Sequence, residues 1–224
     1  MIRSGIVPID EICGGIQPRS IYLLTGGAGA GKTTHALQFA NHGLRCGERV
    51  AMLTHASREE LFALSGRLGI ELPGALREQR ALVLRYRADF PRRLARAGSV
   101  DRMLDDLRSL IGNHRPRRIA IDTFGPLLED GSASPLAALG LIELLTASRA
   151  TALLSYPMDL QASYDRRLEP LVQAAAGIFR IARDERGARR LEVVALRYAP
   201  ALPGAIDYAA LPNVAVPDEP LGIR

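Results

Sequence analysis

The stretch Ile21-Tyr-Leu-Leu-Thr-Gly-Gly-Ala-Gly-Ala-Gly-Lys-Thr-Thr34 is the feature around which the rest of this sequence can be interpreted. It begins with an apolar run, Ile21 to Leu24, that predicts a strand, and an apolar helical face follows it. Between them, Gly26-x-x-x-x-Gly31-Lys32-Thr33 matches the phosphate-binding loop pattern, which requires that strand–loop–helix context. The sequence therefore predicts a phosphate-binding loop between a strand and a helix.

Each residue type in this loop has a physical role. Glycines let the backbone turn its N–H groups onto phosphate oxygens, and the N-terminus of the following helix adds partial positive charge. Lys32, the only lysine in the chain, would reach the β- and γ-phosphates, and the Thr33 hydroxyl would ligate Mg²⁺. The predicted nucleotide-binding residues are Gly26, Gly27, Ala28, Gly29, Ala30, Gly31, Lys32, Thr33 and Thr34.

Length and composition are those of a globular α/β protein. The chain has 224 residues, of which 47% are hydrophobic, and its longest apolar runs are too short to span a membrane. Cys13 and Cys46 lie in unrelated contexts without metal spacing, and no signal peptide is visible, which favours a cytoplasmic location. We expect residues 1–216 to form one domain and residues 217–224 to form an extended or mobile tail.

The basic balance of the chain raises the question of nucleic-acid binding. The net charge is +5, but lysine and arginine together number 29, an ordinary fraction of 224 residues. A nucleic-acid groove needs aromatic or geometric support, and Tyr86 and Phe90 are the only aromatic residues among the arginine clusters. We therefore interpret these clusters as solvated surface: Arg77, Arg80, Arg85, Arg87, Arg92, Arg93 and Arg96, then Arg115, Arg117 and Arg118.

The segment before the loop carries a family resemblance. Residues 4–20 predict a short helix with apolar Ile6, Ile9 and Ile12, followed by a turn at Gly14-Gly15. Together with the loop, residues 4–45 resemble the entry to the RecA-like domains of the KaiC family, and the resemblance continues more weakly along the chain. It implies a RecA-like P-loop NTPase that binds ATP and ADP with Mg²⁺, forms homo-oligomers such as hexameric rings and acts with a protein partner.

The later apolar segments predict a doubly covered, mostly parallel sheet that ends in an antiparallel hairpin. A charged turn at Asp184-Glu-Arg-Gly187 separates the last two predicted strands. Helices are predicted to begin at Ser57, Ser99 and Ser134. The further predicted strands are residues 49–54, 81–86, 118–123, 151–155, 177–182 and 191–196.

Asp122 is the candidate magnesium residue besides Thr33. It ends the apolar strand 118–123, as does the Asp of the second motif of phosphate-loop enzymes, although an Asp in this place can also cap a helix or form a turn. Ser155 and Tyr156 end the next strand, where a sensor of the γ-phosphate would lie. We interpret Tyr156 as a packing residue.

The catalytic glutamate of the family has no obvious counterpart. KaiC-like ATPases carry a pair of glutamates after the second strand, where this chain reads Thr54-His55-Ala56-Ser57. Glu59 or Glu60 would match after a shift, but Ser57-x-x-Glu60 forms a capping box, so we assign Glu60 to the cap. His55 is an alternative base, although a lone histidine is more often structural. The catalytic residue stays unassigned, and we expect slow or absent hydrolysis.

Arg197 is the remaining candidate. The triplet Ala195-Leu-Arg197 aligns with the Lys-x-Arg pair of the KaiC family, which reaches the neighbouring subunit's nucleotide, but Ala195 replaces the lysine. Arg197 could equally pair with a local carboxylate.

The sequence supports an ATP-binding oligomeric switch over three rivals. One rival is an active RadA/RecA-type ATPase on single-stranded DNA, which needs basic and aromatic loops. Residues 125–134 are short and acidic, whereas residues 158–167 offer Tyr164, Arg166 and Arg167. The others are a phosphotransferase, whose phosphosites do not align, and a structural protein with a relic loop, which the intact Lys32 and Asp122 oppose.

Overall fold

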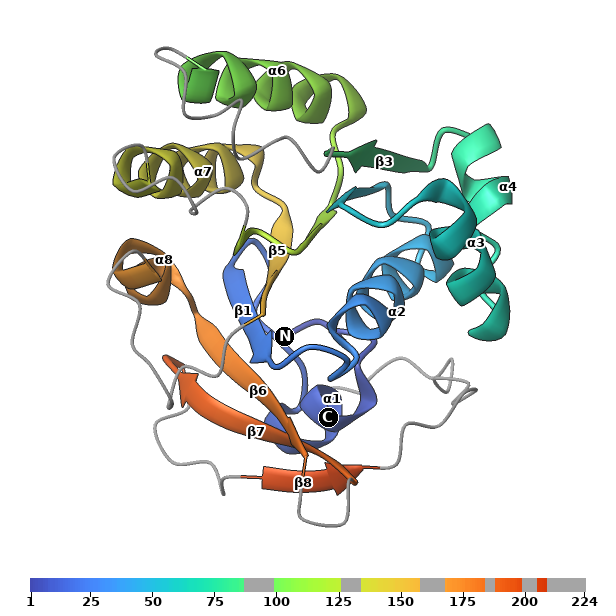
Figure 1. Ribbon diagram of the computed structural model, residues 1–224, viewed down its shortest axis with the longest axis vertical. Coiled ribbons are helices and arrows are strands. Elements are labelled where there is room, and N and C mark those ends of the chain that lie inside the picture. The colour runs from blue at the N-terminus through green and yellow to red at the C-terminus, as the bar shows by residue number, and fades with distance from the viewer. Residues whose placement is uncertain (87–98, 126–133, 158–167, 184–187, 199–204, 209–224) are drawn as a thin grey trace.

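The computed structural model describes residues 1–86, 99–125, 134–157, 168–183, 188–198 and 205–208. Its centre is an eight-stranded sheet with the order β3-β2-β4-β5-β1-β6-β7-β8 (Figure 1). The strands from β3 to β6 run parallel, β7 is antiparallel to β6, and β8 is antiparallel to β7. The strands are β1 (Ile21–Gly26), β2 (Val50–Thr54), β3 (Ala81–Arg85), β4 (Arg118–Asp122), β5 (Thr151–Tyr156), β6 (Gly177–Arg183), β7 (Arg189–Leu196) and β8 (Ala205–Tyr208).

Helices cover both faces of this sheet (Figure 1). One face carries α1 (Val7–Cys13), α2 (Lys32–Arg45), α3 (Arg58–Arg67) and α4 (Leu72–Arg77). The other carries α6 (Ser99–His114), α7 (Ser134–Ser148) and α8 (Glu169–Ala174). The predicted α/β class, with a mostly parallel sheet and a C-terminal antiparallel hairpin, is therefore confirmed.

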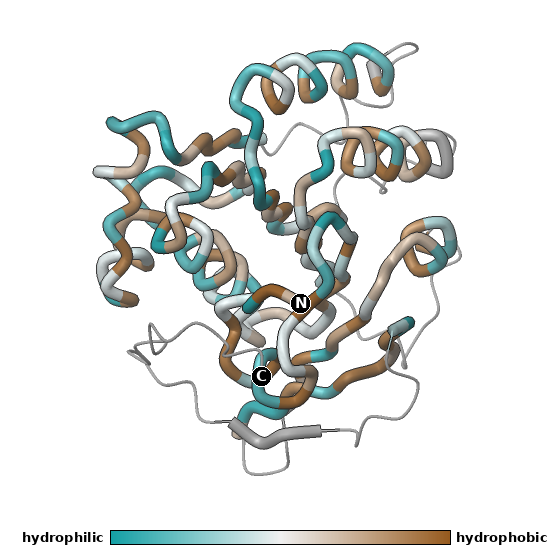
Figure 2. Tube along the Cα trace, turned by 180° about the vertical axis from the view of Figure 1, so that it is seen from behind, coloured by the Kyte–Doolittle hydropathy of each residue, from teal (hydrophilic) through white to brown (hydrophobic). Residues whose placement is uncertain are grey.

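Strand periodicity explains why the sheet is buried on both faces. In β1, Tyr22 and Leu24 pack against the α2 side, whereas Ile21 and Leu23 pack against the α7 side. Side chains alternate across a strand, so a strand covered on both faces is hydrophobic throughout. Figure 2 shows hydrophobic residues following the strands through the middle of the molecule.

The sheet continues beyond the predicted hairpin. Residues 205–208 form β8, which pairs with β7 from Arg189 to Glu192, whereas the sequence showed no periodicity after Pro200. A strand of four residues is too short to give a period-two signal, and its pairing comes from the edge that β7 offers. Residues 217–224, the predicted tail, lie outside the described residues.

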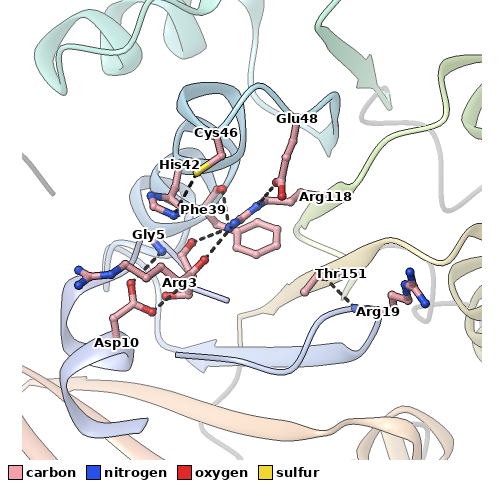
Figure 3. A network of polar contacts seen from close by, with 11 residues as sticks. Arg3, Gly5, Asp10, Arg19, Phe39, His42, Cys46, Glu48, Arg118 and Thr151 are labelled. Atoms are coloured by element: carbon pink, nitrogen blue, oxygen red, sulfur yellow. Dashed lines mark hydrogen bonds and ion pairs between the residues drawn. The ribbon is translucent and has the colours of Figure 1, made fainter. Parts of the chain in front are cut away.

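A buried arginine fixes the N-terminal segment to the centre of the fold. Arg118, at the start of β4, is 2% exposed and pairs with Glu48 at 2.6 Å (Figure 3). Its guanidinium also donates to the backbone carbonyls of Arg3 and Ser4, at 2.9 and 3.0 Å, and lies 5.0 Å from the centre of the Phe39 ring. Because Phe39 belongs to α2, this network joins the N-terminal segment, α2 and β4.

Candidate functional site

The phosphate loop connects β1 to α2 at the carboxyl ends of the parallel strands. A Cβ atom on Gly26 would lie 2.7 Å from the carbonyl oxygen of Ile181, so a side chain there would clash with β6. Gly29 and Gly31 have φ values of +70° and +106°, which favour glycine. The loop therefore requires glycine for close packing at Gly26 and for backbone conformation at Gly29 and Gly31.

Lys32 folds back over this loop. Its Nζ atom donates to the backbone carbonyls of Gly26 and Gly27, both at 2.7 Å. Burial lowers the pKa of Lys32, whereas the negative charge of Asp122 acts in the opposite direction. The negative charge of Asp122 therefore favours the charged form of Lys32.

Asp122 is buried at the end of β4, with one carboxylate oxygen engaged and the other not. Its Oδ1 atom accepts a hydrogen bond from the Ser155 hydroxyl at 2.7 Å. Its Oδ2 atom is buried and has no hydrogen-bond partner among the described residues. A buried carboxylate oxygen without a partner is costly, and oxygen is the ligand that Mg²⁺ and its water shell accept. The Asp122 carboxylate therefore has the chemistry that a magnesium ion or one of its waters would need.

The neighbouring strands hold the end of β4 in place. The Tyr86 hydroxyl donates to the carbonyl of Thr123 and accepts a hydrogen bond from the Thr123 N–H at 3.1 Å. The Thr123 hydroxyl donates to the Ser155 carbonyl at 2.7 Å. Tyr156 is buried and packs against Phe124, with ring centres 5.0 Å apart, in agreement with its predicted packing role. No sequence pattern indicates that Tyr86 or Thr123 belongs to the site.

The end of β2 presents no carboxylate of its own. Thr54 is fully buried, its hydroxyl accepts the Ala56 N–H at 3.1 Å, and His55 is exposed. The predicted capping box is confirmed: the Ser57 hydroxyl accepts the Glu60 N–H at 3.1 Å, and Glu60 Oε2 accepts the Ser57 N–H at 2.6 Å. The Glu60 carboxylate is thus engaged at the start of α3.

Arg189 lies beside the phosphate loop, although no sequence pattern predicts it there. A Cβ atom on Gly31 would lie 3.7 Å from the guanidinium carbon and the Nε atom of Arg189. This Nε is buried and has no hydrogen-bond partner in the described part of the chain. In the antiparallel register of β6 and β7, Arg189 lies opposite Arg183, the last residue of β6, and β6 runs parallel to β1. The hairpin register would have revealed this position, but sequence spacing alone does not.

His35 is a second residue near the loop that the sequence analysis missed. It lies in the first turns of α2, is 5% exposed, and its Nδ1 atom lies 2.7 Å from Oε1 of Gln38. Burial lowers the pKa of His35 from 6.5 to about 4; the Gln38 hydrogen bond opposes this shift, and the positive charge of Arg189 adds to it. His35 is therefore neutral at pH 7.

Arg197 lies at the opposite edge of the sheet from the phosphate loop of its own chain. Its N–H donates to the carbonyl of Ala176 at 2.9 Å, and its exposed guanidinium donates to the carbonyl of Gln173. The adjacent Leu196 pairs with Gly177, which pairs with Tyr22 near the start of β1. From Tyr22 to Gly26 the strand spans roughly 13 Å at ~3.3 Å per residue. Arg197 therefore lies far from the phosphate loop of its own chain.

The predicted arginine clusters do not form one surface. Arg118 was grouped with exposed arginines in the sequence, but it is buried and serves the interior network. Arg115 and Arg117 are exposed at the edge of the sheet away from the phosphate loop. Arg87, Arg92, Arg93 and Arg96 lie outside the described residues, as do residues 126–133 and 158–167. None of the described helices is both long and apolar enough to cross a membrane.

Comparison with known proteins agrees with this geometry. A family model described as "ATPase: KaiC" matches residues 2–209. The circadian clock oscillator protein KaiC of Rippkaea orientalis is 34% identical over 128 residues, which are 56% of this chain and 23% of that protein. KaiC of Synechococcus elongatus is 31% identical over 128 residues, which again are 56% of this chain and 23% of that protein. This chain thus spans less than a quarter of these relatives.

A solved structure supports the same fold. The crystal structure of a KaiC-like protein from Pyrococcus horikoshii OT3 superposes with a TM-score of 0.75 and 21% identity. The match covers 92% of this chain and 98% of that one.

Proposed function

This chain belongs to the KaiC family of ATPases, and from that premise we propose that it is an ATP-binding, nucleotide-dependent oligomeric switch with slow or absent hydrolysis. Residues 1–216 would act as one ATPase domain, and the bound species would be ATP or ADP with Mg²⁺. A protein partner and a cytoplasmic location stay predictions from the sequence.

The proposal rests on one observation. The phosphate site has its binding residues, but the end of β2 has no carboxylate that could act as the base. Lys32 and an Asp122 oxygen that has no partner among the described residues serve the phosphate site, whereas β2 ends at Thr54 and is followed by His55 and Ala56. Glu60, a candidate for the catalytic glutamate, accepts a backbone N–H in the capping box. A positioned general base contributes typically about 10²- to 10⁴-fold in rate, so its loss prolongs the ATP-bound state.

Different residues of the site would bind the phosphates and the magnesium ion. Backbone N–H groups of the glycine loop and the Lys32 ammonium would bind the phosphates, and Arg189 would add a guanidinium from the hairpin. Thr33 and Asp122 would hold magnesium, which when bound neutralises phosphate charge. Ser155 orients the Asp122 carboxylate through its hydroxyl hydrogen bond.

The unique lysine permits a direct test of nucleotide binding. An acyl-phosphate derivative of ATP acylates an amine that lies near its phosphates, and Lys32 is the only lysine side chain available. We expect mass spectrometry to find the acyl group on Lys32, and excess Mg²⁺–ADP to prevent the reaction. Acylation that ADP does not reduce would contradict a nucleotide site at this loop.

Calorimetry then measures the contribution of the lysine. Lys32→Ala should weaken Mg²⁺–ATP binding by about 10- to 100-fold, because charge-assisted hydrogen bonds to phosphate are lost. Arg67→Gln, which removes an exposed positive charge on α3, serves as the matched control and should bind as the parent does. Equal affinity in Lys32→Ala and the parent would remove the lysine from the site.

The rate of ATP hydrolysis distinguishes a nucleotide-dependent switch from an active recombinase-like ATPase. Phosphate release by the purified protein should be slow beside a median enzyme near ~10 s⁻¹, with or without single-stranded DNA. Turnover near that median, or strong stimulation by single-stranded DNA, would favour the rival recombinase-like ATPase.

A further inference from the structure

A cavity of about 500 Å³ lies between α6 and α7, away from the phosphate loop. The two helices pack against each other on one face of the sheet (Figure 1). The buried side chains of Ile111 and Leu144 form part of its apolar floor. The guanidinium-bearing residues Arg108, Arg115, Arg117 and Arg149 also line it.

Three of these four arginines have no ion-pair partner among the residues that the structure describes. Arg108 pairs with Asp105 at 2.5 Å. In the ranges that the structure describes, no carboxylate forms an ion pair with Arg115, Arg117 or Arg149, and all three are exposed. The cavity therefore combines an apolar floor with three positive charges that no described carboxylate pairs with.

Helix ends explain only part of this charge. Arg115 and Arg149 directly follow α6 and α7, where a cation interacts favourably with the helix dipole. Both have a left-handed backbone conformation, with φ values of +51° and +54°. At the end of α1, a glycine, Gly14, has this conformation. A left-handed backbone costs an arginine free energy that glycine avoids. Arg117 precedes β4 and ends no helix, so dipole compensation does not account for it.

We propose that this cavity binds a small organic anion, with an apolar body over Ile111 and Leu144 and anionic groups on Arg115, Arg117 and Arg149. A volume of ~300–1,000 Å³ with an apolar lining and a few polar anchors is typical of small-ligand sites. Guanidinium groups bind phosphate, sulfonate and carboxylate through paired, charge-assisted hydrogen bonds. The ligand class is therefore an amphipathic molecule with two or more such groups.

The lining favours a compact ligand over single-stranded nucleic acid. Recognition of single strands uses aromatic side chains on which bases stack, and no aromatic residue lines this cavity among the described residues. The cavity lies at the amino-terminal ends of β4 and β5, whereas Asp122 and Ser155 mark their opposite ends. An anion in the cavity and a nucleotide at the loop can thus bind at the same time, and the proposal does not depend on the function proposed above.

The test uses 8-anilinonaphthalene-1-sulfonate as a fluorescent probe, because it joins an apolar body to an anion and the chain contains no tryptophan. Titrations contain saturating Mg²⁺–ADP, which occupies the nucleotide site. We expect the double variant Arg115→Gln/Arg149→Gln to bind the probe about tenfold or more weakly than the parent. Arg102→Gln changes an exposed residue of α6 that does not line the cavity, and this variant should bind the probe as the parent does.

A second variant separates cavity binding from attraction to surface charge. Ala147→Phe fills the cavity from α7 without changing charge, and it should also abolish or strongly weaken probe binding. Naphthalene-1,5-disulfonate should displace the probe at lower concentration than pyrophosphate, which carries charge but no apolar body. Circular dichroism and thermal melting verify that each variant is folded.

Four results would overturn the proposal. They are parent-like probe binding in the charge variant, parent-like binding in Ala147→Phe, equal weakening by Arg102→Gln, and displacement by pyrophosphate as effective as that by the disulfonate. The last two would indicate nonspecific attraction to a basic surface.

Discussion

Arg189 begins β7 and Arg197 directly follows its last residue, and the two arginines have different surroundings. Arg189 lies against the glycine loop, and its buried Nε atom has no partner among the described residues, whereas Arg197 is exposed and donates to the carbonyl of Gln173. β7 runs antiparallel to the strands beside it, so its two ends reach opposite edges of the sheet. The strand thus places one arginine beside the phosphate loop and the other at the far end of the strand, where we propose that a second copy of the chain is bound.

The largest difference is expected from Arg189→Ala. Loss of a charge-assisted pair of bonds to phosphate should weaken Mg²⁺–ATP binding by about 10- to 100-fold, as measured by titration calorimetry. Folding should be unaffected, because the Nε atom gives up no hydrogen bond within the described residues.

Arg190→Ala is the matched control, since alternation along β7 directs Arg190 to the opposite face of the sheet. Its affinity for ATP should equal that of the parent. If the two alanine variants bound ATP equally well, Arg189 would be a packing residue of the loop.

His35 sharpens the comparison, because it interacts with Arg189. The pKa of His35 is about 4 in the folded protein, against an ordinary value of 6.5. As the pH falls, the unfolded chain takes up the proton first, so the stabilisation that is present above pH 6.5 is lost between pH 6.5 and 4. The free energy of unfolding should therefore decrease by about 2 kcal/mol between pH 7 and pH 5 from this residue alone.

Urea unfolding of the parent and of His35→Asn at both pH values measures this contribution. Carboxylates and His42 titrate in both proteins, so the difference between the two pH dependences isolates His35. The variant should show the smaller loss on acidification. Identical pH dependence in the two proteins would mean that the histidine is solvated.

The other end of β7 is expected to show a smaller effect, and on assembly rather than on affinity. Arg197→Ala should leave folding intact but weaken ATP-dependent oligomers several-fold, because a guanidinium that bridges to a neighbouring phosphate favours the assembled state. Light scattering coupled to size-exclusion chromatography, with and without ATP, measures this. A variant that assembles as the parent does would leave Arg197 with its local contact to Gln173 alone.

The contrast between these arginines also indicates what the sequence could predict. The glycine loop and Lys32 follow from a local pattern, because strand, loop and helix are consecutive in the chain, and Asp122 follows from its position at the end of an apolar strand. Arg189 and Tyr86 reach the site through strand pairing between distant segments, which no local pattern records. The capping box was predictable for the opposite reason, since both of its hydrogen bonds lie within one helical turn.

The smallest effect is expected at Glu60, where the absence of a change is informative. Glutamine can accept the Ser57 N–H as glutamate does, so Glu60→Gln keeps the capping box but removes the carboxylate. If Glu60 only caps α3, the rate of phosphate release and the thermal midpoint should both stay close to those of the parent. Ser57→Ala, by contrast, breaks the cap and should lower stability by about 1 kcal/mol without changing the rate per folded molecule. Phosphate release that fell by a factor of ten or more in Glu60→Gln, with Ser57→Ala unaffected, would make Glu60 the base that activates water. The strand end of β2 would then be a catalytic site in which the base has moved onto the helix, and the proposed switch would be an active ATPase.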